Sequence, residues 1–222
     1  MGPGVLLAIA AAIAAVVVMT SKKAQTTIAS TATRVVRRTM SSTRGRDLLP
    51  LVAKWAKVFG APVSLVMAII ENESHFDPNA TNLTGGDLKR GGAWGLAQLT
   101  LQTALELHNG NQAVGKQYWP TWDKTGKGLL NPEINVAMAC FGIGRNWKRY
   151  QTQPNNWVVA GLAWNIGPGA LDKKIATAKA NGNWAPILTH AYATHIVKNR
   201  DTDSLIAEVY AQEKSQRLFA YA

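Results

Sequence analysis

Apolar residues three or four positions apart dominate the chain from residue 48 onward, which is the spacing of one face of an α-helix. Glycine- and proline-containing segments separate these stretches, and no convincing period-2 alternation indicates a strand. The pattern predicts helices over residues 48–59, 62–74, 97–108, 132–150, 155–166 and 202–214. We therefore expect residues 47–222 to form one all-α, mainly helical domain. Its last helix, from about Asp203, should pack back on the body through Leu205, Ile206, Val209 and Tyr210.

The first 20 residues follow a different pattern. Residues 2–20 form an uncharged, largely apolar run of 19 residues, at the short end of what spans a bilayer. No basic residue precedes this run and no clear small-residue cleavage site follows it, which disfavours a signal peptide. We expect an apolar helix over residues 1–20 that anchors the chain in a membrane. An alanine-rich helix buried in an assembly is the alternative.

Charge separates the segment that follows from the rest of the chain. Of a net charge of +11, the first 46 residues carry +7 and contain no acidic residue. Residues 21–46 are rich in Ser, Thr and Arg, a composition that predicts a solvated linker. Its cations favour anionic lipid or nucleic acid as a partner. The single cysteine, Cys140, excludes an internal disulfide framework and is expected to be a small core residue.

Glu73 continues an apolar stripe in the helix predicted over residues 62–74. Val66, Ile69 and Ile70 precede it on the same helical face, whereas Glu71 lies about 200° away and should face solvent or the rim. A carboxyl group at the end of a buried stripe is costly to ionise, so its pKa should rise, as a general acid working near neutral pH requires. On periodicity alone, an ordinary carboxylate at the rim of the fold is the alternative.

Five short motifs favour a catalytic role for Glu73 over that of an ordinary carboxylate at the rim. They are ESHFDPNA at 73–80, GAWGLAQL at 92–99 with Thr-Ala at 103–104, NPEINV at 131–136, AWNIGPGA at 163–170, and a late tyrosine, Tyr192, in a helical segment. In order and spacing they resemble the soluble lytic transglycosylase family over about residues 50–200. This resemblance implies a goose-type-lysozyme-like helical fold that acts on the glycan strands of peptidoglycan.

The resemblance also implies the roles of individual residues. Glu73 matches the single catalytic acid/base of the family. The implied substrate-binding residues are Ser74, Gly95, Gln98, Trp164, Asn165 and Tyr192. Several positions depart from the family pattern: Ala97 replaces Met, Leu101 replaces Pro, Trp164 and Gly142 replace Tyr, and an excursion over residues 86–91 lengthens one loop. No metal and no cofactor is expected, because the four histidines lack the spacing of metal ligands.

One glutamate is enough for the implied reaction, in which the MurNAc–GlcNAc β-1,4 bond is cleaved and a 1,6-anhydro ring forms. Ordinary glycosidases need a second carboxylate. For that role Asp77 is a weak candidate, because it precedes a proline and is typical of a turn, and Asp87 is the next. The alternatives are a muramidase on the same scaffold, a structural or membrane-penetrating virion component that binds the wall, and a tail that binds nucleic acid.

The basic residues at 21–46 conflict with a substrate outside the cell, because such residues normally keep a membrane flank in the cytoplasm. A phage particle meets the cell wall from outside and need not obey that rule. We therefore expect an enzyme of the phage virion and the host cell envelope that breaches the wall during infection, with virion proteins as partners. A bacterial inner-membrane enzyme that faces the periplasm is the alternative.

Overall fold

The computed structural model describes residues 43–220 of the chain. The apolar helix expected over residues 1–20 lies outside the described residues, as does the part of the expected linker over residues 21–42. The chain divides into two units, Met1–Thr43 and Arg44–Ala222, and the second contains the predicted catalytic domain of residues 47–222. None of the helices within residues 43–220 combines the length and the apolar character that crossing a bilayer requires.

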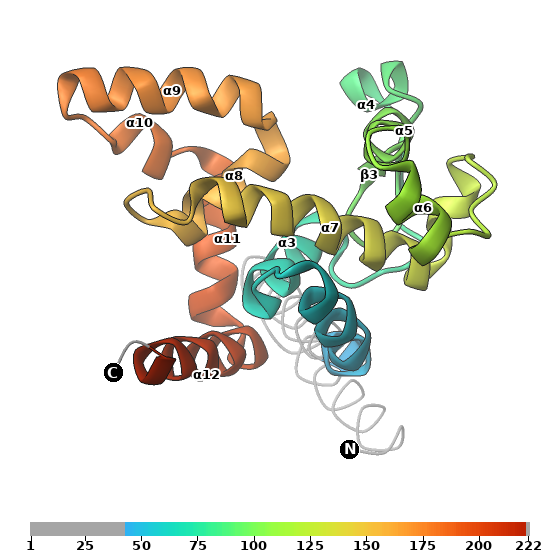
Figure 1. The fold of residues 1–222 in the computed structure, drawn as a ribbon, viewed down its shortest axis with the longest axis horizontal. Coiled ribbons are helices and arrows are strands. Elements are labelled where there is room, and N and C mark those ends of the chain that lie inside the picture. The colour runs from blue at the N-terminus through green and yellow to red at the C-terminus, as the bar shows by residue number, and fades with distance from the viewer. Residues whose placement is uncertain (1–42, 221–222) are drawn as a thin grey trace, which may run out of the picture. The chain divides into compact units, whose positions relative to one another are not determined.

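The described residues are mainly helical, which confirms the fold class expected from the periodicity (Figure 1). A helix over residues 43–59 comes first. The α-helices that follow are α3 (Val63–Ser74), α4 (Gly85–Lys89), α5 (Leu101–Asn109), α6 (Gln112–Tyr118), α7 (Pro132–Tyr150), α8 (Asn156–Ile166), α9 (Pro168–Asn181), α10 (Ala185–Leu188), α11 (Ala191–Thr202) and α12 (Ser204–Ala220). A 3₁₀ helix, η1 (Lys127–Leu130), precedes α7.

The ends of α7 and α5 show how local side chains set helix boundaries. Helix α7 begins where predicted, because the Asn131 side chain accepts hydrogen bonds from the backbone N–H groups of Glu133 and Ile134 and a proline fills the first turn. Helix α5 begins at Leu101 rather than at residue 97. Thr100 caps it by accepting a hydrogen bond from the Thr103 N–H, at 3.1 Å.

A small antiparallel sheet corrects the prediction that no strand occurs. Strands β1 (Thr81–Asn82), β2 (Ala93–Trp94) and β3 (Leu99–Thr100) pair in that order. Each strand has two residues, too few for an alternating pattern to show in the sequence. Pairing of β1 with β2 brings together the two segments that flank α4, which overlaps the excursion over residues 86–91.

Helix α3 lies at the centre of the core and carries Glu73 near its C-terminal end. Residues 65–70 are all buried at 0% exposure, so α3 is covered on every side rather than along one stripe. Helices α11 and α12 pack closely on α3, and α7 and α8 also contact it. The position of Glu73 is therefore fixed by the most deeply buried helix of the described chain.

Helix α12 packs on the body as the sequence predicts. Leu205 and Ile206 are buried, and Val209 and Tyr210 pack against the core. The Glu213 carboxylate accepts hydrogen bonds at 2.5 Å from the Val63 N–H and from the Ser64 hydroxyl, at the start of α3. A carboxylate at this position satisfies N–H groups that have no partner within the helix and interacts favourably with the helix dipole. Helix α12 thus holds the end of α3 opposite Glu73.

Candidate active site

Glu73 lies in the last turn of α3, where the chain leaves the core. The helix ends at Ser74 because His75 and Phe76 adopt left-handed backbone conformations, with φ of 53° and 60°. The Phe76 side chain is buried at 1% exposure and anchors the turn. Glu71, on the same helix, contacts the His75 ring (Nδ1 to Oε1, 3.4 Å) and does not line the cavity beside Glu73. The half-buried Glu73 is therefore the carboxyl group that α3 presents to this cavity.

Tyr192 reaches Glu73 from a helix 119 residues further along the chain. Its hydroxyl donates a hydrogen bond of 2.6 Å to Oε1 of Glu73, and the tyrosine is only 9% exposed. The start of α11 is fixed by His190, whose ring nitrogen accepts a hydrogen bond from the Tyr192 N–H. Because α11 also packs along α3, the tyrosine hydroxyl holds the carboxyl group in one orientation.

The surroundings of Glu73 suit a proton donor at neutral pH. Burial raises the pKa of Glu73 from its ordinary value of 4.5 to about 7, in spite of the opposing effect of the hydrogen bond from Tyr192. The negative charge of Asp87 raises the pKa of Glu73 further. A carboxyl group with a pKa near the working pH can both give and take back a proton, as general acid–base catalysis demands.

Substitution of Tyr192 by Phe should change the pH dependence of the reaction. The hydrogen bond from Tyr192 favours the ionised carboxylate, so its loss should raise the pKa of Glu73. Activity that needs the protonated acid falls as pH rises through about 7, and in Tyr192→Phe this alkaline limb of kcat/KM should move up by roughly one pH unit. A pH–rate profile of both proteins measures the shift. A limb that stays in place or moves to lower pH would show that the tyrosine does not tune the acid.

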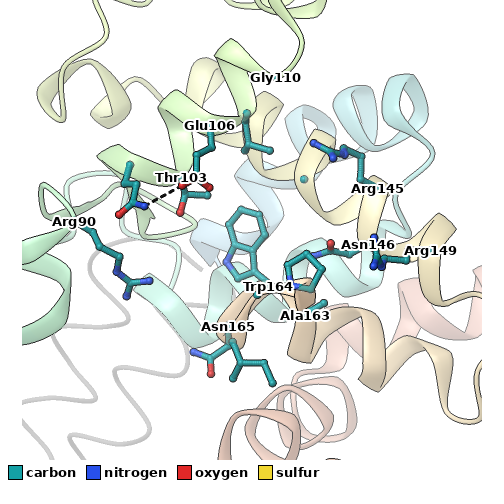
Figure 2. A pocket seen from close by; sticks show the side chains of 16 residues that line it. Arg90, Thr103, Glu106, Gly110, Arg145, Asn146, Arg149, Ala163, Trp164 and Asn165 are labelled. Atoms are coloured by element: carbon teal, nitrogen blue, oxygen red, sulfur yellow. Dashed lines mark hydrogen bonds between the residues drawn. The ribbon is translucent and has the colours of Figure 1, made fainter. Parts of the chain in front are cut away.

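A cavity of about 220 Å³ opens beside Glu73. Its wall brings together Glu73, Gln98, Trp164 and Asn165, which the sequence predicts as site residues far apart in the chain. A second cavity of about 600 Å³ adjoins the first and shares Trp164 and Asn165 with it (Figure 2). The shared wall also includes Arg90 and Thr103, which the sequence reasoning did not select as site residues. The two cavities form an extended groove with Glu73 near one end.

Trp164 lies between the two cavities, and Gly142 makes room for it. A Cβ atom at position 142 would come within 2.9 Å of the indole ring of Trp164. The two departures from the family pattern at positions 142 and 164 are therefore physically linked, because the larger ring needs the missing side chain. The half-buried indole offers a flat apolar surface of the kind on which sugar rings stack.

Neither Gly95 nor Ser74 is among the residues that line the two cavities, and their predicted contacts with substrate stay a prediction. Gly95 has a φ of 70°, and a Cβ there would lie 2.5 Å from the Leu129 carbonyl oxygen and from the Asn135 side chain. Its lack of a side chain lets the loop of residues 94–98 pack against α7 and η1. The Ser74 hydroxyl is buried and donates a hydrogen bond to the Ile70 carbonyl. In the structure both residues support the segments that carry Gln98 and Glu73.

Gln98 does line the cavity, from a strained backbone position. Its φ is 46°, which a residue other than glycine rarely adopts. The side-chain amide donates hydrogen bonds to the carbonyl oxygens of Ala80 and Gly95, at 3.0 and 2.9 Å. The bond to Ala80 joins the loop after α3 to the loop before α5, and the bond to Gly95 lies within the second loop, so Gln98 fixes the shape of the cavity wall.

The two aspartates weighed as a second carboxylate have different surroundings. Asp77 accepts a hydrogen bond from the Asn79 N–H at 3.0 Å, which confirms the prediction of a turn residue. Asp87 lines the cavity with Glu73, and its two oxygens accept hydrogen bonds from Asn82 and Arg90, each at 2.8 Å.

Within the described residues, no three histidine, cysteine, aspartate or glutamate side chains are grouped as metal ligands would be. Cys140 is fully buried in the core, as predicted.

Comparison with protein families matches residues 50–187 to the transglycosylase SLT domain. The matched range includes Glu73, Gln98, Trp164 and Asn165 and ends before Tyr192. A comparison with curated proteins finds no match. The family match covers more than half of the chain and includes most of the groove that the structure forms beside Glu73.

Proposed function

The chain belongs to the transglycosylase SLT domain family, whose lysozyme-like domain is a lytic transglycosylase of peptidoglycan, and on this basis we propose that Glu73 is its single catalytic acid/base. The bond cleaved is the β-1,4 linkage from MurNAc to GlcNAc, and the product carries a 1,6-anhydro ring on MurNAc. The observation that carries this proposal is a half-buried carboxyl group with a pKa of about 7 at the wall of the groove that Trp164 and Asn165 also line.

The reaction balances with one carboxyl group because the substrate supplies the nucleophile. Protonated Glu73 gives its proton to the bridging oxygen, and the bond between this oxygen and C1 of MurNAc breaks. The N-acetyl carbonyl oxygen of the same sugar stabilises the positive charge that develops at C1. The Glu73 carboxylate then takes the proton of the 6-hydroxyl while O6 bonds to C1. Attack within one sugar is effectively unimolecular, and Glu73 ends the cycle protonated.

The other side chains of the site hold Glu73, line the groove or fix the segments that form its wall. The Tyr192 hydroxyl holds one carboxyl oxygen of Glu73 and favours the ionised form that exists after the first transfer. Trp164 and Asn165 stand on the wall that the adjoining cavities share, where a strand that crosses Glu73 would lie. Gln98 and Ser74 act through the backbone segments that they hold.

A muramidase on the same scaffold is the competing function, and Asp87 is the observation that favours it. A hydrolase needs a carboxylate to activate water, and Asp87 is a second carboxylate at the cavity. Both of its oxygens, however, already accept hydrogen bonds from Asn82 and Arg90. We therefore assign Asp87 to holding this part of the wall and to raising the pKa of Glu73.

Digestion of peptidoglycan in ¹⁸O-labelled water separates these two functions. The proposed reaction consumes no water, so mass spectrometry should find 1,6-anhydro ends without ¹⁸O. In Asp87→Asn the product should keep its anhydro end even if the rate falls, because the 6-hydroxyl remains the nucleophile. Reducing ends that carry ¹⁸O, and that disappear in Asp87→Asn, would instead show a muramidase with Asp87 as its base.

We also propose that the enzyme acts from the phage virion at the host cell envelope. Support comes from the sequence alone: residues 2–20 are apolar, and the basic residues at 21–46 oppose export of a domain anchored in this way. Recovery of the protein in purified virions would agree with this location. Recovery only in bacterial inner membranes, with the domain on the periplasmic side, would contradict it.

A further inference from the structure

Lysine and arginine are distributed unevenly along the catalytic domain. Residues 47–133 contain seven of them and eight acidic residues, a net charge of −1. Residues 134–200 contain eight of them and a single acidic residue, Asp172, a net charge of +7. This second excess of positive charge is separate from the basic residues at 21–46 and belongs to the part of the chain that the structure describes. The segment from α7 to α11 is therefore strongly basic in a domain whose first part is nearly neutral.

Four exposed lysines of this segment lie on α7 and α9, and we call them the basic face: Lys148, Lys173, Lys174 and Lys179. The two helices are joined where Arg149 forms an ion pair with Asp172, which also accepts a hydrogen bond of 2.8 Å from the Tyr150 hydroxyl. Two of the lysines are the sequence neighbours of this ion pair. None of the four has an ion pair with a carboxylate among residues 43–220, so their charge is not neutralised by the described protein.

Helix α9 turns its apolar stripe inward and its lysines outward. Its buried residues are Leu171, Ile175 and Ala178, and the helix contacts α8 and α10 (Figure 1). Helical spacing places Lys173 opposite this stripe and the other two lysines of α9 on its two flanks. Three ammonium groups therefore cover the outer surface of a helix that is about 21 Å long.

The chemistry of the basic face fits a flexible polymer of phosphate groups. An ammonium group on a flexible stem binds phosphate oxygens as a point charge. The exposed large apolar side chains in the described part of the chain are Val58, Leu83 and Leu88, and none of them lies on α7 or α9. A surface of this kind has no aromatic platform on which bases stack and no apolar side chains that enter a bilayer. Charge without apolar contact favours a polyanion that has neither bases nor acyl chains.

We propose that the basic face binds a phosphodiester polymer attached to the cell wall and so keeps the enzyme beside the glycan that it cleaves. The choice of a wall polymer rests on the proposed function, which places the enzyme at the wall. The basic face adjoins the groove, because Arg149 lines the groove and pairs with Asp172 of α9. A polymer bound on this face lies beside the groove without entering it, and it takes no part in the chemistry at Glu73.

Binding to cell walls with and without their phosphate polymer tests the proposal. The full chain carrying Glu73→Gln is mixed with walls that bear teichoic acid, or with the same walls stripped of it by hydrofluoric acid, and the walls are sedimented. Binding to the walls that bear the polymer should be at least about tenfold tighter at low salt. Added salt should weaken this binding, because each contact between a lysine and a phosphate releases a condensed cation. Equal binding to both kinds of wall would overturn the proposal.

A matched pair of fourfold variants locates the contact. The basic-face variant has glutamine in place of Lys148, Lys173, Lys174 and Lys179, and the control has glutamine in place of four exposed lysines elsewhere: Lys57, Lys116, Lys124 and Lys127. Both variants lose the same charge and keep the basic residues at 21–46. The slope of log K against log salt should become shallower by about 2–3 in the basic-face variant, at about 0.7 per contact, and stay nearly unchanged in the control. An equal change in both would show an effect of net charge alone and refute the basic face.

Two further measurements distinguish other partners and separate this proposal from the proposed function. A DNA oligonucleotide or an anionic vesicle that binds the basic face more tightly than soluble teichoic acid would contradict the choice of a wall polymer. On stripped walls, the unaltered protein and the basic-face variant should release anhydro products at the same rate. Absence of anhydro products from both proteins would refute the proposed function, while the binding difference between the two kinds of wall would still support the basic face.

Discussion

Replacing Glu73 by glutamine is expected to lower kcat on peptidoglycan by about 10²–10⁴-fold, the range that a general acid contributes. Glutamine has nearly the same volume, and its carbonyl oxygen can accept the hydrogen bond that Tyr192 donates to Glu73. It has no proton to give to the bridging oxygen. The fold and the groove should therefore survive while the chemistry stops. Clearance of a suspension of peptidoglycan, followed over time, measures the loss.

Glu71→Gln is the matched control for this substitution. It makes the same chemical change on the same helix, two residues away, at a side chain that pairs with His75 and does not line the catalytic cavity. We expect this variant to keep most of the activity. If Glu73→Gln cleared the wall as fast as the unaltered protein, the domain would act by binding the wall rather than by cleaving it.

Replacing Asn135 by alanine should have the largest effect on stability, about 3–5 kcal/mol in the free energy of unfolding. Asn135 is fully buried, and its amide oxygen accepts a hydrogen bond of 2.9 Å from the Ala97 N–H. Its amide nitrogen donates hydrogen bonds of 2.9 Å to the carbonyl oxygens of Trp94 and Leu129. Alanine would remove all three hydrogen bonds, two of them buried, at about 1–3 kcal/mol for each group left unsatisfied, before relaxation. Urea unfolding measures the change.

The control for Asn135→Ala is Asn156→Ala. The Asn156 side chain donates one exposed hydrogen bond, to the Gln151 carbonyl at 2.8 Å, so its removal should cost less than about 1 kcal/mol. Because Asn135 holds the loop of residues 94–98, its loss should also move Gln98 and reduce activity in the folded fraction. A cost for Asn135→Ala no larger than that of the control would mean that this loop is held by other contacts.

Long elements of the fold could be predicted from the sequence, and short ones could not. Helices α7 and α8 repeat their apolar residues over several turns, and α7 also has an asparagine–proline start signal. Strands of two residues show no alternation, and α6 is too short for helical spacing to stand out. Helix α9 is longer, but only Leu171, Ile175 and Ala178 are buried, a stripe too narrow to distinguish from a polar segment.

The residues of the candidate site also divide into those that the sequence predicts and those that it does not. Glu73 could be found because it ends an apolar stripe and lies within a motif, and Trp164 and Asn165 because their motif is distinctive. Gly95 and Ser74 lie in equally distinctive motifs, but the motif does not reveal that Gly95 packs against Leu129 and Asn135 or that the Ser74 hydroxyl bonds to the Ile70 carbonyl. Arg90 reaches the groove from the excursion over residues 86–91, and Asn146 from the inner face of α7. Those placements depend on tertiary packing that no local pattern encodes.

Titration of the Glu73 carboxyl group is the most direct test that this residue is the catalytic acid. In protein labelled with ¹³C at the glutamate side chains, the signal absent from Glu73→Gln identifies its carboxyl carbon, and NMR follows this signal against pH. A midpoint near 7 is the predicted result, because burial beside Tyr192 and Asp87 disfavours the ionised form. A midpoint near the ordinary value of 4.5 would mean that Glu73 is fully ionised at neutral pH and has no proton to give.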